Sequence, residues 1–293
     1  MIAPGVSAAG FVAARWLGYA AAFVVVGVAT TAFLSPREDR LFARRLGLAA
    51  AGLGVVSLAA RLVGQAGTLL DPGQPLSLAV VGQTIASRWG SRWELQGLAA
   101  LLALLVFALR HPARAARWTA VFAAGAVAYT LPLTGHALEF PAGPRWGTLA
   151  HGTHLLAGGV WLGSLAVLVP TLWRTPVEGI SAEVVATWRR FSTVALPAGV
   201  LTMLLGGLLA WVDVGRWSNL IATPYGRLLL AKLVLLGGIL ALGAHHWRRV
   251  LPQLPAASAS RGLARTGFVE ALVAFLLLGV TAVLVATPAP ALL

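Results

Sequence analysis

Residues 267–287 have the sequence GFVEALVAFLLLGVTAVLVAT, in which Glu270 is the only ionisable side chain. A helix needs about 20 consecutive apolar residues to cross the hydrocarbon core of a bilayer, and this run is long enough. Seven further runs of the same kind lie between clusters of charged residues, prolines and glycines, at residues 11–34, 46–66, 94–110, 116–136, 148–173, 191–213 and 225–247. We therefore predict an all-α membrane protein, a polytopic bundle of eight transmembrane helices. Closed β-barrels also span bilayers, but they require alternating polarity, and these runs are continuously apolar.

The composition of the chain agrees with this prediction. Hydrophobic residues make up 58% of the 293 residues and charged residues 11%, against about 25% in an ordinary soluble domain. Cysteine is absent, which excludes disulfides, iron–sulfur clusters and thiolate metal sites. The net charge of +13 is attributed to cytoplasmic loops rather than to nucleic-acid binding, because no basic soluble domain remains to bind it.

The connections between the predicted helices alternate in charge. Those that follow the first, third, fifth and seventh helices carry more arginines than those that follow the second, fourth and sixth. Because basic residues concentrate in cytoplasmic loops, we expect both termini on the periplasmic, outer side of a plasma membrane. Residues 1–293 are expected to form a single transmembrane domain.

The segment 75–93 does not fit the pattern of the eight helices. It is apolar up to Ile85 and then polar and aromatic. We interpret it as an interfacial or re-entrant piece that leads into the third transmembrane helix. A ninth crossing here would break the charge alternation.

Three histidines are predicted to gather at the outer side of the membrane. His136 ends the fourth apolar run, and His151 and His154 begin the fifth, in the sequence AHGTHLLAGGVWLG. Their i, i+3 spacing puts His151 and His154 on one helix face, which Trp161 shares. The short loop between the two runs makes them antiparallel neighbours, so the three imidazoles are expected at one depth. Imidazole binds zinc, copper, iron and nickel; the alternative is that these histidines bond loop backbone and water.

The other ionisable groups within or beside the apolar runs have simpler interpretations. Glu270 is either a carboxylate that pairs with Arg261 or Arg265 near a helix start, or a stop for a cation or proton on the inner side. Asp213 is expected to pair with Lys232 or with Arg227. The remaining histidines are interpreted as solvated flanks of the cytoplasmic loops: His111, His245 and His246. No P-loop, dinucleotide-binding, HExxH or GxSxG motif occurs in a suitable context, and we do not expect an enzyme.

The second half of the chain resembles the CopD family of bacterial copper-resistance membrane proteins. The similarity extends from about Gly135 to Pro290, whereas residues 1–133 match only in hydropathy. It rests on GHA at 135–137, HLLAGGVWLG at 154–163, RFSTVAL at 190–196, GGLLA at 206–210, PYGRLLLAK at 224–232, and Glu270 followed by an apolar run that ends in TPAP.

The resemblance implies an eight-helix protein of the bacterial inner membrane that transports or delivers copper in copper homeostasis or resistance. It places His136 and His154 on the family's histidines, Trp161 on its tryptophan, Lys232 on its lysine and Glu270 on its acid. His151 is an addition to that pattern. Proteins of this family often act with a periplasmic copper-binding protein of the CopC type, which we expect to be a separate chain here.

Three functions are therefore compared. In the favoured one, His136, His151 and His154 form an outward-facing copper entry site, with Trp161 beside it and Glu270 further along the path. The first alternative is a membrane redox protein in which the same histidines ligate haem b. The second is an assembly factor that binds copper and hands it on without transporting it. A purely structural bundle would bind no metal.

Overall fold

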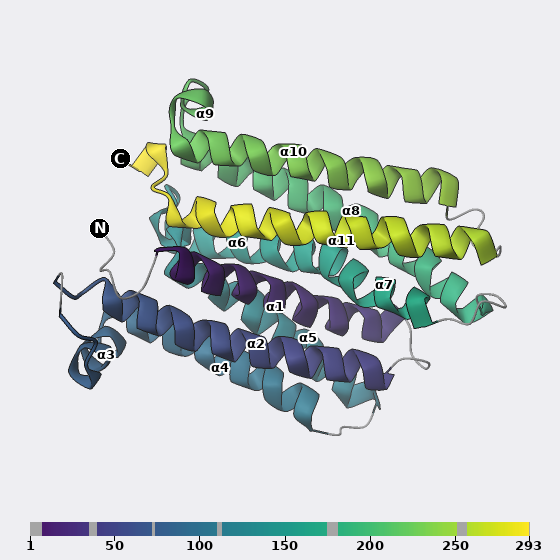
Figure 1. Cartoon of the computed structure of the whole chain (residues 1–293), viewed down its shortest axis with the longest axis horizontal. Coiled ribbons are helices and arrows are strands. Elements are labelled where there is room, and N and C mark those ends of the chain that lie inside the picture. Colours follow the sequence, from purple (N-terminus) through teal and green to yellow (C-terminus); the bar gives the residue numbers. More distant parts are fainter. Residues whose placement is uncertain are drawn as a thin grey trace.

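The computed structural model describes residues 8–34, 40–71, 74–109, 113–174, 181–250 and 257–292, and in these parts the chain is helical without strands. Long helices run side by side and antiparallel along one bundle (Figure 1). The principal helices are α1 (Ala8–Leu34), α2 (Arg40–Gly67), α4 (Arg88–Ala108), α5 (Ala113–Thr130), α6 (Pro144–Gly158), α7 (Ser164–Arg174), α8 (Ala182–Val214), α10 (Pro224–His245) and α11 (Ala257–Ala286).

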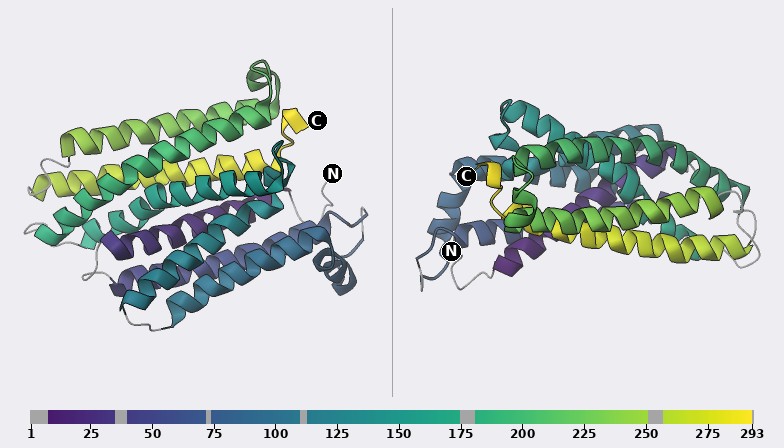
Figure 2. Two further views of the ribbon diagram at one scale, coloured as in Figure 1. Left: turned by 180° about the vertical axis from the view of Figure 1, so that it is seen from behind. Right: turned by 90° about the horizontal axis from the view of Figure 1, so that it is seen from above.

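Shorter elements lie between the long helices or continue them. They are α3 (Leu78–Ile85), the 3-10 turns η1 (Leu131–Thr134) and η2 (His136–Glu139), the π-turn η3 (Gly159–Gly163), α9 (Asn219–Ala222), the π-turn η4 (His246–Val250) and the 3-10 turn η6 (Pro290–Leu292). α3, η2 and α9 lie at the bundle end where α1 begins and α11 ends, which we call the α9 end (Figures 1 and 2).

Seven helical stretches of the described chain are long and apolar enough to cross a membrane. They correspond to seven of the eight predicted runs, to within two residues at the C-terminal ends of two of those runs, and α6, η3 and α7 together form the stretch Pro144–Trp173. The predicted run 116–136 is the exception. α5 is 18 residues long, begins beside Arg114 and Arg117, and ends at Thr130. It ends there because Pro132 cannot continue a hydrogen-bonded helix and restricts the residue before it.

α5 nevertheless runs antiparallel to α4 along the bundle, over about 27 Å at 1.5 Å per residue (Figure 1). The start of α1 and the end of α11 consequently lie at the same end. Segment 75–93 forms α3 and the start of α4 rather than a further long helix. Ser77 caps α3 by accepting from the backbone N–H of Val80, and Ser87 caps α4 by accepting from that of Gly90.

The core forms around α1. This helix packs against α2 on one side, α5 and α7 on another, and α11 on a third. Val25, Val26 and Ala29 of α1 are each 2% exposed. In contrast, α8 and α10 bury few of their residues and contact each other sparsely. They form the outer layer of the C-terminal half, and this loose packing leaves the space described below.

Candidate metal site

α6 and η3 present His154 and Trp161 to the same neighbouring helix, α8. His154 Nδ1 lies 2.9 Å from the carbonyl oxygen of Thr202. A β-carbon added to Gly206 would lie 2.9 Å from His154 Cε1, and one added to Gly199 would lie 3.3 Å from the Trp161 ring. Two glycines seven residues apart on α8 therefore accommodate two large side chains seven residues apart on α6 and η3. The prediction that His154 and Trp161 share a face is confirmed.

The contact with Thr202 defines which ring nitrogen of His154 is available. A carbonyl oxygen only accepts hydrogen bonds, so the proton of the neutral imidazole lies on Nδ1. Nε2 then carries the lone pair that a metal ion requires. A hydrogen bond from the other ring nitrogen to backbone is the usual way in which a ligating histidine is oriented.

The π-turn η3 brings α1 against this element. A β-carbon on Gly163 would lie 1.9 Å from the carbonyl oxygen of Phe23, and one on Gly27 would lie 2.2 Å from the Gly163 carbonyl carbon. The two backbones are thus in direct contact, and only glycine is accommodated at either position. π-turns of this kind are frequent at functional sites, and here the turn contains the buried Trp161 and follows the helix that carries His154.

A buried polar network holds the segment that precedes His136. Arg61 of α2 and Gln96 of α4 are 2% and 3% exposed, and Arg61 Nη1 donates to Gln96 Oε1 over 3.0 Å. Both side chains also donate to the Thr134 hydroxyl, and Gln96 Nε2 bonds the carbonyl oxygen of Thr130 at 3.0 Å. The N-terminal half therefore positions η1, and with it His136 two residues further on.

The histidines do not form a preassembled coordination sphere. His136 and Lys232 act electrostatically on His151, and His151 and Lys232 act on His154, so the four side chains lie near one another at the α9 end. Over the residues that the structure describes, however, no three His, Cys, Asp or Glu side chains are close enough to hold one metal ion. His136 lies in η2 rather than at the end of a long helix, because α5 stops at Thr130.

Asp213 has a different partner from the one expected. Its Oδ2 accepts a hydrogen bond of 2.7 Å from the Tyr225 hydroxyl. In the described part of the chain it makes no ion pair with Lys232 or Arg227, although Lys232 interacts with it electrostatically over a longer distance. Tyr225 is buried at the start of α10, and its hydroxyl occupies the hydrogen-bonding position at the carboxylate.

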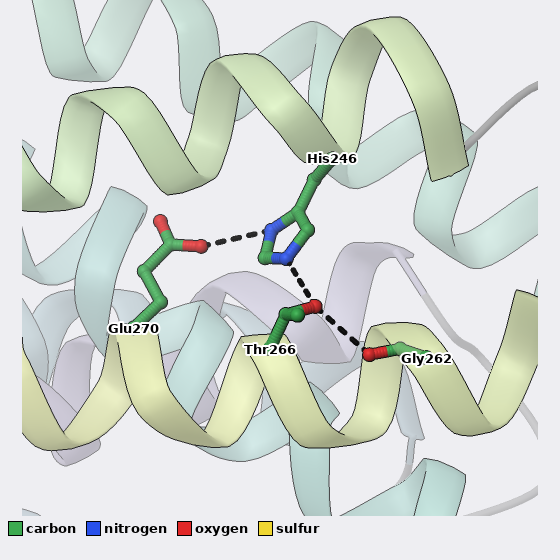
Figure 3. A network of polar contacts seen from close by, with 4 residues as sticks. All are labelled: His246, Gly262, Thr266 and Glu270. Carbon is green, nitrogen blue, oxygen red and sulfur yellow. Dashed lines mark hydrogen bonds and ion pairs between the residues drawn. The ribbon is translucent and has the colours of Figure 1, made fainter.

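Glu270 lies apart from the histidine cluster and is paired with His246, not with Arg261 or Arg265 (Figure 3). His246 Nδ1 lies 2.9 Å from Glu270 Oε2, and the two side chains are 12% and 3% exposed. His246 Nε2 lies 2.6 Å from the Thr266 hydroxyl. His246 is therefore not the solvated flank that the sequence suggested. Only the packing of α10 and η4 against α11 brings the two side chains together, and no spacing along the chain announces it.

A cavity of about 320 Å³ extends from Trp161 to the His246–Glu270 pair. Trp161 of η3 and Gly199 of α8 line it, and so do His246 and Glu270. The rest of its lining is mostly apolar and comes from α7, α8, α10, η4 and α11, with Met203 as its only sulfur-containing residue among those described. Trp161 thus contacts Gly199 of α8, seven residues from the Gly206 that faces His154, and lines the cavity that extends to Glu270.

The fold and this arrangement define a class: a multi-pass membrane protein with imidazoles at one end of its bundle and buried ionisable groups further along it. Two family models match the chain. One, described as Copper resistance protein D, covers residues 185–284, and the other, Copper resistance protein D-like, N-terminal domain, covers residues 6–146. The chain belongs to the CopD family of copper resistance and copper transport proteins.

A curated relative supports the assignment. The Copper transport protein CutJ of Bacillus subtilis (strain 168) is 32% identical over 212 residues, which is 69% of this chain and 37% of CutJ. The chain thus spans little more than a third of that relative's length. No solved structure matches the chain significantly. The N-terminal family model includes the helices that carry Arg61 and Gln96, which the sequence resemblance alone had not reached.

Proposed function

We propose that the protein moves copper across the bacterial inner membrane, with its α9 end on the outer side. His136, His151 and His154 receive the ion at that end. The ion then passes Trp161 into the cavity and proceeds toward Glu270. The observation that supports the proposal is the face of α8 that both side chains share. His154 packs at Thr202 and Gly206, and Trp161 packs further along the same helix at Gly199, which lines the cavity together with Glu270.

The proposed orientation follows from charge. The starts of α2 and α8 and the turn η4 lie at the bundle end opposite α9 (Figure 1), and they carry clusters of arginine: Arg44, Arg45, Arg189, Arg190, Arg248 and Arg249. Basic residues favour the cytoplasmic side, so the α9 end faces outward. Counting α5 as the eighth crossing puts both termini outside. A separate periplasmic copper-binding protein of the CopC type is the proposed source of the ion.

The entry site is proposed to assemble around the ion. His154 is already oriented by Thr202, so its Nε2 is the fixed ligand. His136 lies in a short 3-10 turn, which can adjust more readily than a long helix, and His151 lies one helical turn before His154. Lys232 and Asp213 lie close enough to influence the charge of the site without occupying it. Imidazole ligands suit Cu(II) in particular.

Metal content and visible absorbance of the detergent-purified protein test this function. The native chain and variants with alanine at His136, His151 or His154 are compared, and His245→Ala, an exposed histidine at the other end, is the matched control. Stoichiometric copper that falls in the three variants but not in the control supports the entry site. A Soret band lost in the same variants replaces copper transport with haem binding, and neither copper nor haem after loading rejects both.

A further inference from the structure

In the pair formed by His246 and Glu270, the surrounding hydrogen bonds leave no proton between His246 Nδ1 and Glu270 Oε2 when His246 is neutral. Thr266 donates its hydroxyl hydrogen to the carbonyl oxygen of Gly262 over 2.9 Å (Figure 3). Having used its hydrogen, that hydroxyl can only accept from His246, so the ring proton of neutral His246 lies on Nε2. Nδ1 then carries a lone pair, and Glu270 Oε2 lies 2.9 Å from it.

Two acceptor atoms this close repel each other unless a cation lies between them. Although the distance is that of an ion pair, Oε2 receives no hydrogen bond of normal geometry from any described residue. A carboxylate buried at membrane depth also requires a positive partner, and among the described residues only His246 is within ion-pair distance. The pair thus requires either a proton or a metal ion.

The geometry fits a metal ion. With metal–ligand bonds of about 2.0 Å, as imidazole nitrogen and carboxylate oxygen form, atoms 2.9 Å apart subtend an angle of about 90° at the metal. That is the angle between neighbouring ligands in the tetragonal N,O coordination of Cu(II). The Thr266 hydroxyl would orient the ring from its other nitrogen, as supporting groups do in known metal sites.

The surroundings supply the remaining coordination positions. His246 and Glu270 both line the cavity of about 320 Å³, which is large enough to hold several water molecules. A site with two protein ligands and open positions binds an ion less tightly than a closed one. Such a site suits an ion that must leave again.

We propose that His246 Nδ1 and Glu270 Oε2 form a second copper-binding site at the far end of the cavity, where the ion pauses after it has passed Trp161. This proposal rests on the proposed function, because it takes copper as the ion that enters. His246 lies fourteen residues beyond Lys232 along α10, or about 21 Å at 1.5 Å per residue. Lys232 acts electrostatically on both His151 and His154, so we take it to mark the entry site and expect about 2 nm between the two sites.

The test counts bound Cu(II) and measures the spacing of the ions by pulsed electron paramagnetic resonance on the full chain. Expected are two ions per native chain, with a dipolar distance of about 2 nm. Glu270→Gln, which keeps the shape of the side chain, and His246→Gln should each bind one ion and lose the dipolar signal. His245→Gln, which alters the exposed neighbour of His246, should bind two.

The outcomes separate this site from the entry site. One ion in the native chain that disappears in His154→Ala but persists in Glu270→Gln overturns the second site and leaves the proposed function intact. Two ions in both native protein and Glu270→Gln, with slower transport in the variant, would assign the pair to a proton instead, and this also overturns the proposal. No copper in any chain overturns the proposed function itself.

Discussion

Substitution of Gly206 by alanine is predicted to weaken copper binding without touching a ligand. The added β-carbon would lie 2.9 Å from His154 Cε1, whereas ordinary van der Waals contacts are 3.4–4 Å. The imidazole must therefore move by about 0.5–1 Å, or α8 must shift away. The ring is also held by Thr202, so movement lengthens the 2.9 Å contact that orients Nε2.

The expected magnitude follows from how strictly metals define their ligands. Metal–ligand distances tolerate about 0.2 Å, which is less than the required displacement. Loss of a supporting contact around a metal ligand costs about 10–100-fold in affinity, which corresponds to about 1.4–2.7 kcal/mol. Relief of the overpacking by a backbone shift instead costs about 1–3 kcal/mol in stability. Thermal unfolding in detergent separates this loss of stability from a loss of copper affinity.

Gly207→Ala is the matched control, since a β-carbon there has no atom within 4 Å. Copper affinity is measured by titration against a chelator whose absorbance reports free copper. We expect Gly206→Ala to bind at least 10-fold more weakly than Gly207→Ala. Equal affinities in two well-folded variants would refute the reasoning, because they would mean that the contact with α8 does not position His154 for the metal.

Two further predictions concern the elements that hold the site. Gly163→Ala should lower the yield and thermal stability of folded protein, because its β-carbon would lie 1.9 Å from a carbonyl oxygen of α1, whereas Gly125→Ala, with nothing within 4 Å, should be tolerated; equal melting temperatures would contradict this. Thr134→Val should cost about 1–3 kcal/mol by removing the acceptor that Arg61 and Gln96 share, and should weaken copper binding through His136. Denaturant unfolding and the same chelator titration measure it, and an unchanged midpoint would show that the network does not hold η1.

The sequence predicted the transmembrane helices well because their length and apolarity are local properties. The exception shows the limit of that signal. The run 116–136 continues past Pro132 without a change in hydropathy, yet α5 ends at Thr130 and two 3-10 turns follow. Backbone geometry, not apolarity, determined this boundary. Eight crossings and the outward position of the termini remain predictions.

The candidate site could be predicted in part. The spacing of His154 and Trp161 predicted their common face, because helical periodicity alone sets it. The predicted partner of Asp213, Lys232 or Arg227, was wrong. The carboxylate instead accepts a hydrogen bond from the uncharged hydroxyl of Tyr225, which a prediction based on opposite charges does not consider. The predicted metal-binding role of His136, His151 and His154 stays a prediction.

The role of His246 was missed for a different reason. Beside Arg248 and Arg249 it has the local sequence of a cytoplasmic flank, and only the packing of α10 against α11 brings it to Glu270. The cavity could not be predicted from the sequence either, since it depends on how loosely α8 and α10 contact each other. Both features arise from tertiary packing, which no local pattern in the chain encodes.

Copper flux into proteoliposomes tests the central claim most directly. The full chain is reconstituted into vesicles that contain a fluorescent copper chelator, and the rate of signal increase is compared with that of His154→Ala, the control His245→Ala and protein-free vesicles. The account predicts saturable entry for the native chain and the control, and a loss of at least 10-fold for His154→Ala. Native protein that binds copper but gives the same flux as protein-free vesicles would contradict it, and would favour a protein that hands copper on without transporting it.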